Sequence, residues 1–225
     1  MTENILHYGL NRSGTNYLKE LLALYFDINF INNEDERNNP LHKHFRLYDN
    51  KDLIDRENFH NTVFFRNFDD FLKEAAPDNS VKMIAVISKD PYSWDLSYRS
   101  WGKKNNWEEP AHQPVLEYNE FYRKWYAFSQ ESEKIVMIRY MDLLQEPAVT
   151  LEYLRKRFNL PLRTELSNIK KIRKVPMSHR FTRKRRRYYT KMRYLDDYSP
   201  DALNEINQLI DHDLIKKMGY KSYGI

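Results

Sequence analysis

The chain has 225 residues, of which 41% are hydrophobic and 15% aromatic, and its formal net charge is +5. This length and composition predict one folded domain with a substantial core and argue against a disordered chain. Cysteine is absent, which excludes a disulfide framework and a thiolate metal site. No apolar stretch approaches the roughly 20 residues that a membrane span needs, and none reaches signal-peptide length, so we expect a soluble, cytoplasmic protein.

The first predicted elements are a strand, a glycine-bounded turn and a helix. The strand is the apolar run Ile5–Tyr8, and the helix carries one apolar face made of Leu18, Leu21, Leu22 and Tyr25. A turn between such elements binds phosphate, because backbone N–H groups point into it and the helix N-terminus is partly positive. Gly9 and Gly14 have the spacing of a P-loop, but Thr15 follows at once where a nucleotide-hydrolysing loop has lysine. The cation of this loop is Arg12 instead.

The tetrapeptide Arg12–Thr15, in this context, resembles the 5′-phosphosulfate loop of the sulfotransferases. That family transfers a sulfuryl group from 3′-phosphoadenosine 5′-phosphosulfate (PAPS) to a hydroxyl or an amine and releases adenosine 3′,5′-bisphosphate (PAP). The resemblance implies that Arg12 stabilises charge on the leaving phosphate. It also implies that the 5′-phosphosulfate is held by Asn11, Arg12, Ser13, Gly14, Thr15 and Asn16. A strand–turn–helix without a ligand is the alternative.

The next segments are a possible strand over Asp27–Asn32, an exposed loop over Asn33–Pro40, and a stretch with two histidines. Sulfotransferases carry a catalytic Lys and His shortly after the phosphate loop, and Lys43 and His44 resemble that pair. The resemblance implies that His44 is the general base and that Lys43 stabilises the bridging oxygen. We choose His44 over His42 because it directly follows the lysine, and an exposed basic loop is the alternative.

A buried strand is predicted over Val81–Ser88, a nearly continuous apolar run that suits a parallel sheet. The residues after it resemble the family's second motif, in which a strand precedes Arg, any residue and Pro, with Ser eight positions after the Arg. Lys89, Pro91 and Ser97 keep this spacing. The resemblance implies that Lys89 and Ser97 bind the 3′-phosphate of PAPS. Lysine lacks the bidentate fork of arginine, so we expect a different geometry there, and a ligand-free turn is the alternative.

The remaining predicted elements alternate between helices and strands. We expect a short strand over Asn61–Arg66, helices over Phe68–Ala76, Glu117–Gln130 and Pro147–Phe158, a loop over Trp107–Gln113, a strand over Lys134–Tyr140, and one last helix from the Ser199 cap to Gly219. This order predicts a three-layer α/β, P-loop-like domain with a mostly parallel central sheet. Ligands of such sheets bind at the carboxyl ends of the strands.

The charge of the chain is concentrated near its C-terminus. The segment 163–193 holds 13 Lys and Arg against one acid, Glu165. Such a segment indicates a polyanionic partner or a solvated arm. Sulfotransferases often bring an Arg-Lys-Gly loop onto the 3′-phosphate, and the resemblance implies this part for Arg183 and Lys184. No glycine follows them, so the correspondence is incomplete.

The function that the resemblance implies is sulfuryl transfer from PAPS to an acceptor that no motif identifies: a sugar, lipid, phenol or peptide hydroxyl, or an amine. No metal-ligand cluster is visible, and this chemistry needs none.

Two alternatives stay open. One is a P-loop kinase-like protein, although the lysine after Gly14 is missing. The other is a nucleic-acid-binding protein that uses the segment 163–193, which leaves the spacing of Lys89 and Ser97 unexplained.

Overall fold

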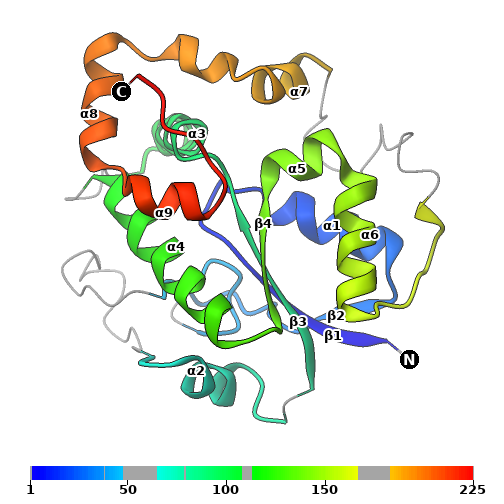
Figure 1. Ribbon diagram of the computed structural model, residues 1–225. Coiled ribbons are helices and arrows are strands. Elements are labelled where there is room, and N and C mark those ends of the chain that lie inside the picture. Colours follow the sequence, from blue (N-terminus) through cyan, green and yellow to red (C-terminus); the bar gives the residue numbers. More distant parts are fainter. Residues whose placement is uncertain are drawn as a thin grey trace.

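The computed structural model describes residues 2–37, 39–47, 65–78, 80–107, 113–166 and 183–224. Its centre is a parallel sheet of strands β1 (Glu3–Tyr8), β2 (Ile28–Phe30), β3 (Val81–Ser88) and β4 (Ile135–Arg139), in the order β2-β1-β3-β4. Every described strand pair is parallel. The predicted parallel α/β sheet is therefore confirmed, and all carboxyl ends of its strands lie at one edge (Figure 1).

Helices cover both faces of this sheet (Figure 1). They are α1 (Thr15–Tyr25), α2 (Phe68–Ala75), α3 (Pro91–Lys104), α4 (Pro114–Glu131), α5 (Tyr140–Gln145), α6 (Pro147–Phe158), α7 (Arg183–Thr190), the 3₁₀ helix η3 (Arg193–Asp197), α8 (Pro200–Leu209) and α9 (His212–Lys217). Within the described residues, no helix is long and apolar enough to cross a membrane.

The side chains of β3 point alternately to the two faces of the sheet, and each face has its own hydrophobic core. Met83, Ala85 and Ile87 point to the face covered by α1 and α6, where they pack with leucines of both helices. Ile84 and Val86 point to the opposite face, where the aromatic side chains of α4 are buried. Because side chains of a strand alternate between its two sides, a run that is apolar throughout requires a helix layer on each face. The three-layer arrangement follows directly from this run.

The C-terminal helix differs from the prediction. A single helix was expected to run from Ser199 to Gly219, but the chain forms α8 and α9 with a break at Ile210 and Asp211. Asp211 is extended, and its carboxylate accepts a hydrogen bond from the N–H of Leu214. It also pairs with Arg123 on α4 at 2.8 Å. Asp211 therefore caps a second helix and ties it to α4, which apolar periodicity could not indicate.

Two other expected segments fall largely outside the described residues. Of the predicted strand Asn61–Arg66, only Phe65 and Arg66 are described, and neither lies in a strand. Of the predicted loop Trp107–Gln113, only its first and last residues are described.

Candidate active site

The loop between β1 and α1 has the backbone that its glycines predict. Gly14 has φ +105° and is the residue before the first turn of α1, and Arg12 is also left-handed at φ +72°. A Cβ at Gly14 would stand 2.6 Å from the ring of Tyr140, so only glycine fits. No side chain caps α1, and its first turn contains no acid. The N–H groups of that turn are therefore left for an anion.

The predicted loop residues are held in different ways. The carbonyl of Asn11 accepts a hydrogen bond from the indole Nε1 of Trp94 on α3 at 2.9 Å. Ser13 is fully buried, so its side chain lies inside the loop, and Thr15 is buried as the first residue of α1. Asn16 is exposed and accepts a hydrogen bond from Lys43 Nζ at 2.9 Å. The structure thus joins the predicted phosphate loop to the predicted Lys-His pair.

His44 is attached to the same loop. Its Nδ1 lies 2.7 Å from the carbonyl oxygen of Gly9, and the N–H of Gly9 donates to the carbonyl of Lys43 at 3.2 Å. A carbonyl oxygen only accepts, so Nδ1 carries the proton and Nε2 keeps its lone pair. Burial lowers the pKa of His44 to about 3, with a hydrogen bond to Gly9 opposing that shift. The imidazole is therefore neutral at neutral pH, as a proton acceptor must be.

His42 has the opposite tautomer. Its Nδ1 accepts a hydrogen bond from the backbone N–H of His44 at 3.1 Å, which occupies the lone pair of that nitrogen. The proton of neutral His42 is therefore on Nε2. Burial, together with the charges of Arg37 and Lys43, lowers its pKa to about 4. Neutral His42 has no lone pair left to take a proton, whereas His44 has one.

Lys89 is a buried cation at the carboxyl end of β3. Its side chain is 3% exposed, and its Nζ donates to the hydroxyl of Tyr189 on α7 at 3.0 Å and lies 4.3 Å from the centre of that ring. Burial lowers the pKa of Lys89. Burial alone would raise the pKa of Tyr189, but Lys89 and Arg185 hold it below its usual value. Helix α7 is thus docked onto the end of β3, above the strand ends (Figure 1).

Tyrosine hydroxyls hold this strand end in place. Tyr118 and Tyr122 on α4 donate to the carbonyls of Lys89 and Ile87, at 2.7 and 2.9 Å. Asp90, the next residue, caps α3 by accepting from the N–H of Ser93 at 3.1 Å. The backbone that carries Lys89 is therefore fixed before any ligand arrives.

Arg12 acts electrostatically on Lys89 and contacts α3 through Trp101. Its guanidinium carbon is 5.7 Å from the ring centre of Trp101, and its buried Nε has no hydrogen-bond partner. Burial and the charge of Arg185 lower its pKa. Within the described residues, neither Arg12 nor Lys89 forms an ion pair with a carboxylate. Ser97 is half-buried on α3, one turn before Trp101 and on the same side of that helix.

In the basic segment 163–193, the residue that acts on Arg12 and Lys89 is Arg185, which the Arg-Lys-Gly motif did not indicate. Arg183 and Lys184 are exposed at the start of α7, and the structure gives them no contact with Arg12 or Lys89 among the described residues. Arg185, one position later, acts on both cations and hydrogen-bonds to Tyr189. The sequence spacing could have indicated Arg185, because Arg185 and Tyr189 are four residues apart and therefore lie on the same face of a helix.

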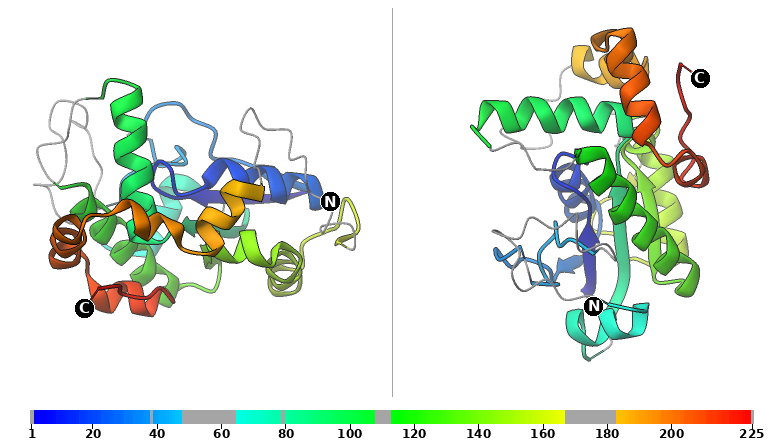
Figure 2. Two further views of the ribbon diagram at one scale, coloured as in Figure 1. Left: turned by 90° about the horizontal axis from the view of Figure 1, so that it is seen from above. Right: turned by 90° about the vertical axis from the view of Figure 1, so that its left-hand side faces the viewer.

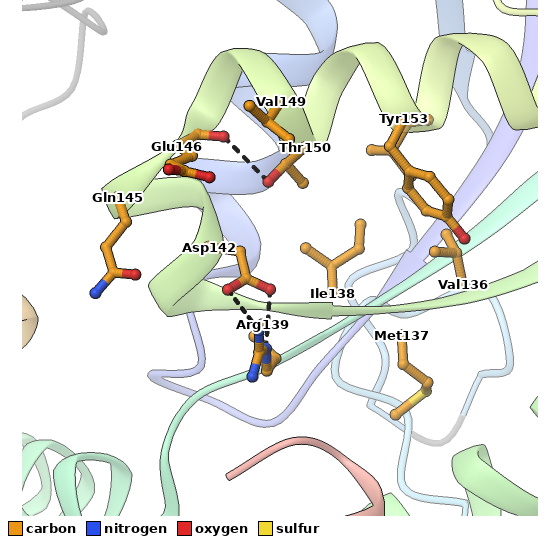
Figure 3. Close-up of a pocket in the computed structure, with 11 residues that line it drawn as sticks. Val136, Met137, Ile138, Arg139, Asp142, Gln145, Glu146, Val149, Thr150 and Tyr153 are labelled. Atoms are coloured by element: carbon orange, nitrogen blue, oxygen red, sulfur yellow. Dashed lines mark hydrogen bonds and ion pairs between the residues drawn. The ribbon is translucent and has the colours of Figure 1, made fainter.

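A separate groove of ≈ 390 Å³ lies between the open edge of β4 and α6 (Figure 3). Arg139 and Asp142 form two hydrogen bonds of 2.8 Å across its floor. None of the predicted site residues lines it.

In the described parts of the chain, no group of His, Asp and Glu is placed to hold a metal ion.

Comparisons with known proteins bear on the fold. No protein-family model matches the sequence, and no curated protein matches it. Among solved structures, the mouse sulfotransferase SULT7A1, crystallised with PAP, is similar at a TM-score of 0.56 and 12% identity. The match covers 96% of this chain and 87% of that one. The fold is sulfotransferase-like. At 12% identity the similarity shows the fold alone. It does not identify a donor or an acceptor for this protein.

Proposed function

We propose that this protein transfers a sulfuryl group from PAPS to an acceptor hydroxyl, or to an amine. The observation that carries the proposal is the buried Lys89 at the end of β3, with the half-buried Arg12 and the exposed Arg185 near it; among the described residues, neither Arg12 nor Lys89 forms an ion pair with a carboxylate. A buried cation without a counter-ion is costly. A ligand with several negative charges at this edge would remove that cost, and the orphan Nε of Arg12 offers it a donor.

The residues divide between the two ends of the nucleotide. The amides of Asn11–Asn16 and the Arg12 side chain hold the 5′-phosphosulfate, because the uncapped turn of α1 opens there. Lys89 and Ser97 hold the 3′-phosphate, with α7 as a cover that contributes Arg185 in place of the predicted Arg183 and Lys184. Each charge-assisted hydrogen bond of this kind contributes roughly 1.5–3 kcal/mol.

His44 is the general base in this proposal. Its Nε2 takes the proton of the acceptor, while the Nδ1–H bond to Gly9 holds the ring in the required tautomer. PAPS supplies the sulfuryl group, with its 5′-phosphate as leaving group. Arg12 and Lys43 offset the negative charge that the leaving phosphate gains. In the balanced reaction, the acceptor oxygen bonds to sulfur, the bond from sulfur to the phosphate oxygen breaks, and its electron pair stays on PAP.

The two alternatives explain less of the site. A kinase needs an acidic strand end for magnesium, and the acid available after β3, Asp90, is buried and used as the cap of α3. A nucleic-acid-binding role explains the exposed cations of α7 but not a lysine that is 3% exposed beneath them.

Isothermal titration calorimetry with PAP, ATP and a single-stranded RNA separates the three functions. We expect PAP to bind most tightly, because it alone carries both a 3′- and a 5′-phosphate monoester on one nucleoside. Tighter binding of ATP would favour the kinase-like function, and tighter binding of RNA the nucleic-acid one.

A further inference from the structure

Strand β4 lies at the border of the sheet and is paired on one side only. It bonds to β3, and no described strand lies beyond it. The N–H of Ile84 on β3 donates to the carbonyl of Lys134 at 2.8 Å. Bonding residues alternate along a parallel ladder, so Val136 and Ile138 also bond to β3. The N–H and C=O of Met137, which stands between them, therefore point away from β3, toward the groove that Met137 lines.

The first part of this edge is already protected. Arg157 on α6 donates to the carbonyls of Glu133 and Ile135, both at 3.1 Å. A charged side chain laid over the backbone is one way in which proteins keep an edge strand from pairing. Among the described residues, the backbone of Met137, two positions further on, has no such cover. The unprotected edge is therefore short and centred on Met137.

One stripe of α6 borders the same groove. Glu146, Val149, Tyr153 and Arg157 follow one another at spacings of three or four residues, which places them on one face of the helix (Figure 3). Val149 is 63% exposed and Tyr153 is 50% exposed, more than any other large hydrophobic side chain of the described residues. In both views of Figure 2, α6 lies at the border of the molecule. Exposed apolar side chains beside a free strand edge indicate a contact surface.

The two ends of this stripe carry opposite charges. Glu146 is exposed at the start of α6, and Arg157 is exposed near its end. Within the described residues neither side chain forms an ion pair: Arg157 bonds to backbone carbonyls and to the hydroxyl of Tyr153 at 2.8 Å. Other charges of α6 pair among themselves, as Arg155 does with Glu152. From the start of the helix to its end, the stripe reads acid, apolar, apolar, base.

We propose that this surface joins two copies of the chain in a symmetric dimer, with the two β4 strands paired antiparallel around Met137. A two-fold interface presents the same patch on both sides, so the patch must be complementary to itself. Reversing the stripe gives base, apolar, apolar, acid. Arg157 of one protomer therefore meets Glu146 of its partner, and the apolar side chains meet in the middle. A strand from an unrelated protein would match the free edge but not this order of charges.

The strands and the helices obey the same two-fold axis. Helix α6 runs antiparallel to β4, because its start lies beside Arg139 and Asp142 at the end of the strand, and Arg157 reaches the carbonyls at the start. Pairing at Met137 therefore lays the two α6 helices side by side on one face of a continuous sheet. A short strand pair is weak alone, so the α6 stripes supply most of the affinity.

Sedimentation of the parent chain at concentrations from about 1 to 100 µM tests the dimer. We expect a concentration-dependent shift to twice the monomer mass. Val149→Glu should raise the Kd of the dimer at least about tenfold, because it places a charge among the apolar side chains. Leu24→Glu, at another exposed apolar side chain on α1, is the matched control and should leave the Kd unchanged. A parent that stays monomeric at about 100 µM, or a Val149→Glu variant that dimerises like the parent, would overturn the proposal.

Glu146→Lys tests the reversed order of charges. The lysine would face Arg157 of the partner at two equivalent contacts, so we expect the Kd to rise about tenfold, and added salt should reduce that difference. Glu34→Lys is the matched control, at an exposed acid that follows β2 on the opposite edge of the sheet. Equal effects of the two substitutions would refute the pairing of Glu146 with Arg157.

Hydrogen exchange tests the strand pairing. The Met137 amide should exchange at least about tenfold more slowly in the parent dimer than in Val149→Glu, whereas Ile138, bonded to β3, should be protected in both. A dimer in which Met137 exchanges as fast as in the monomer would refute pairing at this edge. The interface is separate from the nucleotide site, since no predicted site residue lines the groove. A parent chain that fails to bind PAP would remove the proposed function and leave the dimer standing.

Discussion

His44 Nδ1 lies 2.7 Å from the carbonyl oxygen of Gly9, so the candidate base is tied to the first residue of the phosphate loop. The contact spans 35 residues of sequence. The contact fixes the tautomer in which Nε2 can accept a proton. Because the acceptor is a backbone atom of Gly9, the contact also fixes the distance between His44 and the phosphate loop. A side-chain substitution at Gly9 would disturb both, since a Cβ there would stand 2.6 Å from the carbonyl of Ile87.

The first prediction concerns this base. His44→Ala should lower turnover by about 10²- to 10⁴-fold while PAP affinity stays near the parent value. Slow hydrolysis of PAPS serves as the assay while the acceptor is unidentified. His42→Ala should be milder, because its lone pair only orients the backbone of His44. An active His44→Ala beside an inactive His42→Ala would transfer the role to His42.

The second prediction concerns the 3′-phosphate. Lys89→Ala should weaken PAP by roughly 1.5–3 kcal/mol and adenosine 5′-phosphate by little, because the latter has no group to pair with Lys89. Calorimetry with both nucleotides gives the difference. Equal losses of affinity for the two nucleotides would mean that Lys89 only adds to the positive electrostatic potential of the site and does not bind the 3′-phosphate. Thermal melts of Lys89→Ala would show whether the fold is retained.

The third prediction compares cations of α7. Arg185→Ala should weaken PAP by roughly 1.5 kcal/mol, because Arg185 faces Lys89, Tyr189 and Arg12. Arg183→Ala and Lys184→Ala are matched controls on the same helix, with exposed side chains and no contact to that cluster. The motif assigned the role to these two residues, so a larger loss in either control would restore that assignment.

The fourth prediction concerns backbone conformation. Gly14→Ala should destabilise the fold by roughly 1–2 kcal/mol through its left-handed φ alone, and the contact with Tyr140 adds to that cost. Gly102→Ala in α3 should instead stabilise by roughly 0.5–1 kcal/mol, because a Cβ there meets Trp107 at an ordinary 3.8 Å. Urea unfolding midpoints measure both, and a tolerated Gly14→Ala would contradict the loop geometry.

The fifth prediction concerns pH. His7 is fully buried, and burial lowers its pKa to about 3, against 6.5 as the ordinary value. The unfolded chain therefore binds the proton more readily, and the stability due to neutral His7 is present above pH 6.5 and lost as the pH falls. The expected loss between pH 7.5 and 5.5 is about 1.4 kcal/mol for this group.

The urea midpoint of the parent and of His7→Gln at the two pH values tests this effect. The variant should lose less stability than the parent. Asp90 acts in the opposite direction, because burial raises its pKa to about 6, so the folded protein takes up a proton there as the pH falls toward 4. Parallel pH profiles of parent and variant would show that His7 is not the titrating group.

The sequence by itself determined the features that depend on neighbouring residues. Strand β3 and helix α6 begin and end where apolar periodicity and proline predict, and the parallel α/β sheet follows from their alternation. The strand–turn–helix around Gly14 was predicted because glycine chemistry is local. The positions of Lys89 and Ser97 after β3 follow from spacing along the chain.

The tertiary structure alone decided which side chains meet. Five cations follow one another in α7, and successive helical residues point about 100° apart, so the docking of Tyr189 on Lys89 selects Arg185 over Arg183 and Lys184. The roles of His42 and His44 depend on tautomers, and the tautomer of His44 is set by Gly9, which is distant in sequence. Contacts across long sequence separations leave no periodic trace in the chain, and for that reason only the folded arrangement reveals them.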